Sequence, residues 1–281
     1  MINYCDKKFD RLLCENKDKK NVRDCYPCIR FIHDFNNRTV HYSCPKMMMY
    51  YVPKHLYRYS MEIMQLCGRI QSISKKDEIF FSSIGCGPCS ELFGALSDWY
   101  NRGKDISKFH FKGFDTEQMW EPVMSGINSL FENKIDVEAL NYDFFSYYKE
   151  NPSAVVDVIF LNFMLSDCIK FDEANFPNFV KRISEFLVDR KPAFLLINDI
   201  YCRNTIRAYN QLEKGLLDCA PCRFGKWQYA EFNSFIGCFG EKVNPIKINS
   251  IPQSIVRKYD PFNYTNSVQS IIKFDWNAAN N

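Results

Sequence analysis

The stretch SSIGCGPCSELFGAL, residues 82–96, joins an apolar run to an amphipathic helix through a turn with two glycines. The apolar run, EIFFSSI (78–84), has the composition of a buried strand. Gly85 and Gly87 carry no Cβ, so a ligand can approach the backbone of the turn closely. The helix that begins near Pro88 presents free N–H groups and the positive end of its dipole. This combination predicts a binding site for a carboxylate or a phosphate group.

Strand-like runs alternate with helical periodicity from residue 78 to residue 217. Such alternation predicts a parallel sheet with helices on both faces, and ligands bind such sheets beyond the carboxyl ends of the strands. Five runs are the expected strands: EIFFSSI, FHFKGFD (109–115), IDVEAL (135–140), VVDVIFLNF (155–163) and AFLLIND (193–199). Two further candidates follow in the tail: YAEFNSFIGCFG (229–240) and SVQSIIKFDW (267–276).

Polar side chains stand where three of these strands end. Asp115 ends the second strand, where its carboxylate can accept hydrogen bonds from both hydroxyls of a ribose. Asp143, just after the third strand, can accept one from an adenine amino group. Asn162 stands at the end of the fourth strand, in LNFMLSD (161–167), which opens the site toward a second substrate.

The five motifs IFFSSIGCGP, FKGFD, ALNYDFF, VDVIFLNF and AFLLIND, in this order and spacing, resemble the class I S-adenosylmethionine-dependent methyltransferases. The resemblance covers residues 78–275. It implies a doubly wound α/β fold with a mostly parallel, seven-stranded sheet, helices on both faces and an antiparallel last strand. The two tail strands can supply that end of the sheet. The activity that the resemblance implies is methyl transfer from S-adenosylmethionine.

The same resemblance implies where this cofactor binds. The methionine end lies over the glycine turn, Asp115 holds the ribose, Asp143 holds the adenine amino group, and Asn162 lines the reaction pocket. The implied cofactor-binding residues are therefore Ser83, Gly85, Cys86, Gly87, Asp115, Asp143 and Asn162.

Two positions in the turn depart from the family pattern. Many members have Asp or Glu where this chain has Ser83, and that acid holds the ammonium group of the cofactor directly or through water. Many also have a third glycine where this chain has Cys89. Serine accepts a hydrogen bond without charge assistance. We therefore expect the cofactor to bind, either more weakly or with help from Glu91.

Two other functions stay open at this point. A nicotinamide-dependent oxidoreductase has a similar fingerprint, but its third glycine would stand at position 90, which is Ser90 here. A binding or scaffolding protein that kept the fold and lost turnover is compatible with the departures at Ser83 and Cys89.

The methyl acceptor is not identified by the sequence, and RNA and a small molecule both remain open. The Asp/Asn-Pro-Pro-aromatic motif of amino-methylating DNA enzymes is absent after the fourth strand, where NFML stands. The Pro88-Cys89 pair lies in the first loop, so Cys89 is not read as a cytosine-C5 nucleophile. Methyl transfer requires alignment, and proton removal when the acceptor is protonated. Three residues are candidate bases: Asp167, His55 and Tyr201.

We expect residues 1–75 to form a helical, Cys-rich region ahead of a cofactor-binding domain, 76–281. Cys25, Cys28, His41 and Cys44 have the spacing of a structural zinc site, with His33 as a competing ligand. Some ribosomal-RNA guanine methyltransferases share this layout. Alternatively, these cysteines are buried thiols that pack as small hydrophobes.

The segment KMMMYYVPKHLYRYSMEIM, 46–64, has two interpretations. It is either a lid whose Tyr50, Tyr57 and Tyr59 stack on a base while Lys54, His55 and Arg58 meet phosphate, or a helix that packs its apolar face on the sheet and solvates its charges. We favour the second.

The overall composition is that of a globular protein. Of 281 residues, 46% are hydrophobic and 16% are aromatic, which disfavours long disorder. The net charge of +3 is far from that of a dedicated nucleic-acid binder. No signal peptide or membrane-spanning run is evident, and the 13 cysteines are spread too widely for a small disulfide scaffold. We therefore expect a cytoplasmic protein with reduced thiols and no membrane partner.

Overall fold

The computed structural model describes residues 1–12, 25, 28–29, 44–200, 202–219, 223–224, 228–231, 237–238, 241–242, 251–261 and 267–276. Its centre is a sheet in which five strands run parallel in the order β3-β2-β1-β4-β5. These strands are β1 (Ile79–Ile84), β2 (Phe109–Asp115), β3 (Asp136–Asn141), β4 (Val158–Asn162) and β5 (Phe194–Ile200). All five lie where the apolar runs predict them, with small shifts at their ends.

Strand β10 (Ser267–Asp275) extends this sheet and runs antiparallel to β5. Its other side pairs with two short strands, β7 (Gln228–Glu231) and β6 (Arg223–Phe224), which bring the sheet to eight strands. The mostly parallel α/β fold is thus as expected, but a count of seven strands is not confirmed. The run 229–240 is not one strand, because its end pairs elsewhere, as β8 (Gly237–Cys238) with β9 (Glu241–Lys242).

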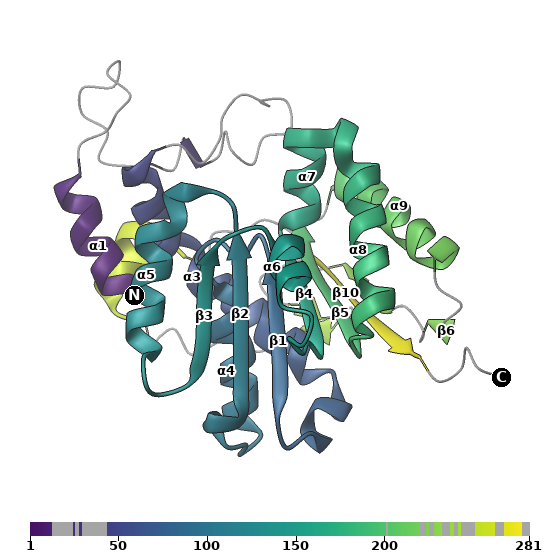
Figure 1. Ribbon diagram of the computed structural model, residues 1–281. Helices are drawn as coiled ribbons and strands as arrows, with labels where there is room; N and C mark the ends of the chain where they lie inside the picture. The colour runs from purple at the N-terminus through teal and green to yellow at the C-terminus, as the bar shows by residue number, and fades with distance from the viewer. Residues whose placement is uncertain are drawn as a thin grey trace.

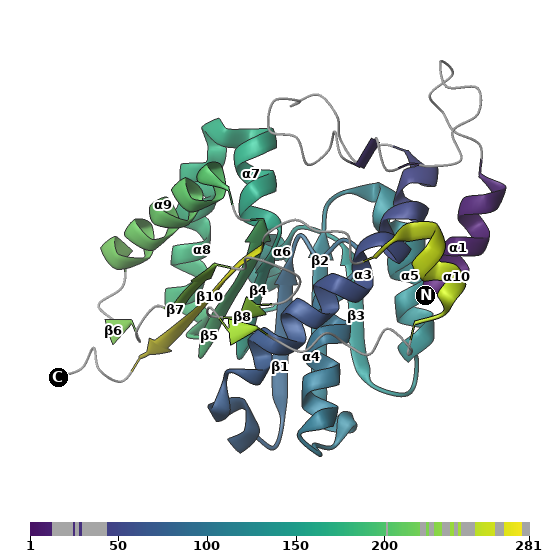
Figure 2. The ribbon, with the colours of Figure 1, turned by 180° about the vertical axis from the view of Figure 1, so that it is seen from behind.

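Helices cover both faces of the sheet, because successive residues of the buried strands point to opposite sides. Val158 and Phe160 of β4 join one core cluster, and Ile159 and Leu161 join the other. The first face carries α1 (Ile2–Arg11), α3 (Pro45–Gly68), α4 (Ser90–Asn101), α5 (Glu121–Phe131) and α10 (Gln253–Tyr259). The second carries α6 (Phe144–Glu150), α7 (Met164–Asp172), α8 (Phe176–Arg190) and α9 (Arg203–Cys219). Figure 1 shows α6 and α8 in front of the sheet, and Figure 2 shows α3 and α4 on the opposite side.

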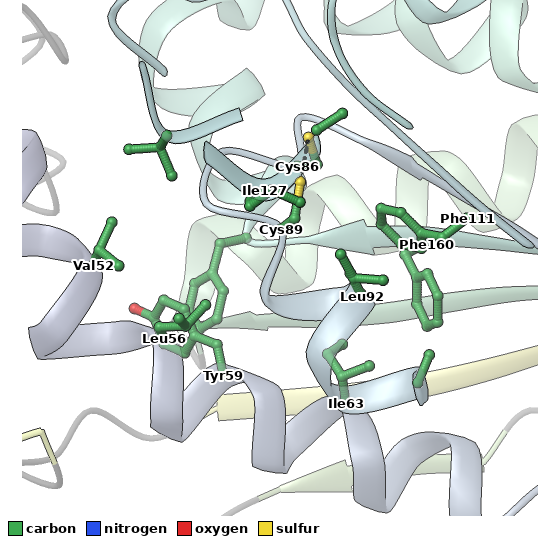
Figure 3. Close-up of a cluster of buried hydrophobic side chains, with 14 of the residues drawn as sticks. Val52, Leu56, Tyr59, Ile63, Cys86, Cys89, Leu92, Phe111, Ile127 and Phe160 are labelled. Carbon is green, nitrogen blue, oxygen red and sulfur yellow. Dashed lines mark hydrogen bonds between the residues drawn. The ribbon is translucent and has the colours of Figure 1, made fainter. Parts of the chain in front are cut away.

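Helix α3 belongs to the same core as the sheet. Its apolar side chains pack with those of α4 and of β1, as Figure 3 shows for Ile63 beside Leu92. The expectation that this helix packs on the sheet is therefore met, but the expectation that its charges are solvated is wrong, because Lys54, Arg58 and Glu62 are buried. Most of residues 13–43, between α1 and α3, lies outside the described part of the chain.

Two of the buried charges of α3, Arg58 and Glu62, bond to each other and to strands β5 and β10 of the sheet, whereas Lys54 donates to the carbonyl oxygen of Asp260. Arg58 Nε pairs with Glu62 Oε1 at 2.8 Å, and both side chains bond to Ser267 Oγ of β10. Asn198 of β5 donates to Glu62 Oε2 at 2.9 Å, and Gln269 of β10 donates to Asn198 Oδ1 at 3.0 Å. A buried polar network of this kind stabilises only when every member has its partners. It therefore fixes α3 in one position against β5 and β10.

Candidate cofactor site

A cavity of about 650 Å³ opens at the carboxyl ends of β1, β2 and β4. This is the switch point of the fold, since β1 leads to β2 on one side while β4 lies on its other side. Six of the seven residues predicted to bind the cofactor line this cavity: Gly85, Cys86, Gly87, Asp115, Asp143 and Asn162. The seventh, Ser83, is completely buried beneath it.

The turn between β1 and α4 needs glycine for its backbone conformation. Gly85 and Gly87 have φ of +66° and +46°, in the left-handed region that glycine adopts readily. A Cβ on Gly85 would stand 2.6 Å from Met164 Sδ, and one on Gly87 would stand 3.2 Å from the Trp120 ring. Both the backbone conformation and the neighbouring side chains therefore disfavour any residue other than glycine at positions 85 and 87.

Cys89 explains why a third glycine is common at its position. Its φ is +54°, so it holds the left-handed conformation with a side chain attached. Its thiol is buried and donates to Cys86 Sγ at 3.4 Å, as the dashed line in Figure 3 shows. Burial is the main reason that the pKa of Cys86 lies well above its ordinary value. The two cysteines are therefore a buried part of the loop, and they are hydrogen-bonded to each other.

Asp115 is held in place by the turn itself. Its Oδ2 accepts from the Gly87 N–H at 2.9 Å, and its Oδ1 accepts from the Glu117 N–H at 2.8 Å. Desolvation raises the pKa of Asp115 to about 6, against the effect of these backbone donors. Each oxygen has a second lone pair, so a carboxylate in this geometry can still accept bonds from two hydroxyls on one ligand.

Asp143 stands at the N-terminus of α6. Its Oδ1 accepts from Ser146 N at 2.9 Å and Ser146 Oγ at 2.7 Å, and pairs with Arg182 at 3.0 Å. Burial alone would raise the pKa of Asp143, but the bonds from Ser146 and Arg182 outweigh it and lower the pKa. Since all three contacts use Oδ1, Oδ2 is the oxygen that can accept a hydrogen bond from a ligand in the cavity.

Asn162 is fixed at both ends of its amide. Its Nδ2 donates to Ser90 Oγ at 2.9 Å, and its Oδ1 accepts from Asn198 Nδ2 at 2.8 Å. Ser90 Oγ donates in turn to Glu91 Oε2 at 3.3 Å. The network that anchors α3 thus continues through Asn198 and Asn162 to the first turn of α4, at the floor of the cavity.

Comparison with known proteins gives structural neighbours only. No protein-family profile and no curated protein sequence matches this chain. Among solved structures, the plantazolicin methyltransferase BpumL in complex with SAH has a TM-score of 0.47 and 12% identity, over 96% of this chain and 99% of that one. The delta-N METTL16 MTase domain has a TM-score of 0.45 and 11% identity, over 76% and 82%. PH1948 of Pyrococcus horikoshii, described as a candidate RNA methyltransferase, has 0.44 and 10%, also over 76% and 82%.

At these TM-scores and identities the neighbours carry no weight for function. The sheet itself is more informative, because a dinucleotide-binding sheet continues in parallel as 3-2-1-4-5-6. Here the strand beside β5 is the antiparallel β10, as the resemblance implies. The fold is that of the class I methyltransferases.

Aromatic side chains from several parts of the chain also line the cavity of this methyltransferase fold. Tyr59 of α3 stacks on Phe163, with ring centroids 4.1 Å apart, and Tyr51 meets Trp120 at 5.5 Å. Phe163 follows Asn162 directly and has φ of +56°, an uncommon conformation for a bulky residue. Sequence reasoning missed Trp120 and Phe163. Phe163 stands directly after β4, where we consider only polar groups from the sequence, and Trp120 lies in the connection between β2 and α5.

The three candidate bases have different positions. Asp167 of α7 lines the cavity. His55 stacks on Tyr59, with centroids 5.1 Å apart, and is not among the lining residues. Tyr201 lies outside the described residues.

The predicted zinc ligands are only partly described. Cys25 is buried, Cys28 and Cys44 are half-buried, and His41 and His33 lie outside the described residues. No group of three or more His, Cys, Asp or Glu side chains in the described part of the chain has a metal-binding arrangement. The structure therefore gives no support for zinc. Within the same residues, no helix is both long and apolar enough to cross a bilayer.

Proposed function

We propose that this chain is an S-adenosylmethionine-dependent methyltransferase that binds its cofactor over the Gly85–Gly87 turn. The observation that carries the proposal is the Asp115 carboxylate, which two backbone N–H groups orient at the edge of a cavity at the switch point. The cavity is large enough for a nucleoside ligand. Its carboxylates suit a cofactor that carries ammonium and sulfonium charges.

The roles of the residues follow from their positions. When bound, S-adenosylmethionine supplies an electrophilic methyl group on its sulfur. Asp115 holds the ribose hydroxyls, Asp143 accepts from the adenine amino group through Oδ2, and the glycine turn lets the ligand lie against backbone. Asn162, fixed by Ser90 and Asn198, keeps the end of β4 rigid so that an acceptor is aligned. Asp167 is the candidate base that faces this cavity.

Of the two acceptor classes, the described lining favours a small molecule over RNA. Six carboxylates line the cavity: Glu91, Asp115, Glu117, Asp143, Asp167 and Asp172. Arg182 is the single lysine or arginine among the described lining residues, and it pairs with Asp143. An RNA backbone needs a basic approach, whereas this lining suits an uncharged or cationic acceptor with an aromatic face.

Titration calorimetry with S-adenosylhomocysteine and NADPH tests the cofactor. We expect binding of the first and none of the second, and the reverse result would favour an oxidoreductase. Transfer of labelled methyl groups to a cell extract, with and without ribonuclease treatment, tests turnover and acceptor class. Labelling that ribonuclease abolishes would contradict the small-molecule acceptor, and cofactor binding without any transfer would favour a scaffold.

A further inference from the structure

Glu91 is a buried carboxylate at the floor of the cavity. It stands in the first turn of α4, only 1% exposed, and it lines the cavity together with Ser90 and Asn162. Ser90 Oγ donates to its Oε2 at 3.3 Å, which is a long bond between neutral and charged groups. The residue thus lies between the ends of β1 and β4, the two central strands of the sheet.

No described residue neutralises this carboxylate. None of the described ion pairs includes Glu91, and Arg182, the described cation of the lining, is paired with Asp143. Burying a charge without a partner is costly, and acidic residues are seldom fully buried unless paired. Desolvation accordingly raises the pKa of Glu91 to about 7, against donors that include Asn162 and Ser90. A cationic ligand would remove this penalty.

Ser83 stands next to Glu91, at the position where an acidic residue is common in proteins with this turn. Ser83 is fully buried, and its Oγ has no hydrogen bond of ordinary geometry with any residue that the structure describes. It nevertheless lies close enough to the Glu91 carboxyl to help lower the pKa of that group. The position that carries an acid in many proteins with this turn is therefore neutral here, and a carboxylate from α4 occupies the adjoining space.

We propose that Glu91 is the counter-ion of the cofactor's ammonium group, in place of the acid that position 83 lacks. This inference rests on the proposed function and adds one contact to it. The ammonium group and the carboxylate are each poorly solvated in the cavity, so their pairing is charge-assisted and desolvated. Glu91 would then bind the amino-acid end of the cofactor and make no contact with the nucleoside.

Two ligands separate that end from the rest. S-adenosylhomocysteine has the ammonium group, and 5′-methylthioadenosine has the same nucleoside and thioether but no amino-acid end. Calorimetry with both ligands at pH 8 compares wild type, Glu91→Gln and the control Asp172→Asn, which removes a lining carboxylate on α7. We expect Glu91→Gln to weaken S-adenosylhomocysteine binding by roughly 10- to 100-fold, the usual range for a charge-assisted bond. We expect less than a 3-fold change for 5′-methylthioadenosine, and no selective change in Asp172→Asn.

The outcomes are distinct. Suppose that wild type binds both ligands. If Glu91→Gln then weakens the binding of both ligands equally, or does not weaken the binding of either, Glu91 is a structural residue. The inference is overturned in that case, while the proposed function stands. If wild type binds neither ligand, the proposed function and the inference both fail. If Glu91→Gln and Asp172→Asn both weaken the binding of S-adenosylhomocysteine and not that of 5′-methylthioadenosine, the ammonium group responds to the overall negative charge of the lining. The specific pairing with Glu91 is then overturned.

A measurement on wild type alone decides the matter if Glu91→Gln does not fold. The preference for S-adenosylhomocysteine over 5′-methylthioadenosine should rise between pH 6 and pH 8, as Glu91 ionises. Ser83, Ser90 and Asn162 face Glu91 and do not titrate, and the raised pKa of Cys86 keeps its thiol neutral. Asp115 titrates near pH 6, but it serves the ribose that both ligands share. A constant preference would overturn the inference.

Discussion

At the scale of single residues, the cavity contains carboxylates whose environments push their pKa values apart. The pKa of Glu91 is about 7 and that of Asp115 about 6, both raised chiefly by desolvation, whereas Ser146 and Arg182 lower that of Asp143. Shifts of this kind gather at functional sites because binding needs charges that folding alone would avoid. The site is therefore held at some cost to the stability of the cofactor-free protein.

Glu91→Gln should stabilise the cofactor-free protein at pH 8. Because the pKa of Glu91 is raised on folding, the unfolded chain loses this proton first, and stability falls as pH rises from about 4.5 to about 7. Glutamine does not titrate, so the variant should match the stability of wild type at pH 4. At pH 8 its free energy of unfolding should be higher by roughly 2–3 kcal/mol. Urea unfolding at both pH values checks this. Asp115 and Asp199, with pKa values of about 6, titrate in both proteins, so their contributions to the pH dependence cancel in the difference between variant and wild type. A loss of stability at pH 8 would mean that Glu91 has a cationic partner.

Asp115→Ala should weaken both ligands alike, unlike Glu91→Gln. The substitution removes the acceptor for the Gly87 and Glu117 N–H groups together with the proposed ribose contact. We expect a loss of about 1.5–3 kcal/mol in the binding free energy of S-adenosylhomocysteine and of 5′-methylthioadenosine, measured by calorimetry. Unchanged affinity in a folded variant would remove Asp115 from the ribose site.

At the scale of elements, the glycine turn can be tested with a matched control. Gly87→Val places a branched side chain at φ of +46° and against Trp120, and should abolish S-adenosylhomocysteine binding. Gly103→Val suffers a similar strain, at φ of +69°, but apart from its chain neighbours no described residue lies within 4 Å of its added Cβ, and it is not among the described lining residues of the cavity. It should keep wild-type affinity, which calorimetry measures. Equal binding by both variants would mean that the ligand does not lie over this turn.

The anchoring of α3 predicts a strong effect on stability at two residues that are not among those described as lining the cavity, Arg58 and Glu62. Arg58→Met leaves Glu62 buried without its cation, which should cost about 3–5 kcal/mol in the free energy of unfolding. Arg58→Met combined with Glu62→Met should cost much less than the sum of the single changes, since no charge is left behind. Urea denaturation of the four proteins gives the coupling. An additive result would mean that the pair is not buried together in solution.

The strands were predictable from the sequence, but their partners in the tail were not. The five parallel strands are short apolar runs that helices cover on both faces, a pattern visible locally. The run 229–240 looks equally continuous, yet it divides between β7 and β8 because each pairs with a different strand. The pairing of β7 with β10 depends on contacts far apart in sequence, which a local pattern does not reveal. Asp115, Asp143 and Asn162 were found because they end or follow strands, whereas the burial of Glu91 depends on the surrounding ends of β1 and β4.

At the scale of the whole molecule, the metal content of the chain stays a prediction. If Cys25, Cys28, His41 and Cys44 hold zinc, purified protein should contain about one zinc per chain by elemental analysis. Cys25→Ser should lose the metal and destabilise the N-terminal region. Cys219→Ser, in a second C-x2-C pair, is a control that should keep it. Folded, metal-free protein prepared without a chelator would exclude the site.

The place of β10 in the sheet has a consequence for synthesis of the protein. This strand pairs with β5 on one side and with β7 on the other, and its Ser267 and Gln269 complete the network around Glu62. Until residues 267–275 have left the ribosome, the nascent chain must keep the edge of β5 open, with the Arg58–Glu62 pair lacking its last partners. Open strand edges invite aggregation. A ribosome-stalled chain that ends before residue 267 should therefore bind chaperones and resist folding, although every strand of the parallel sheet has already been made.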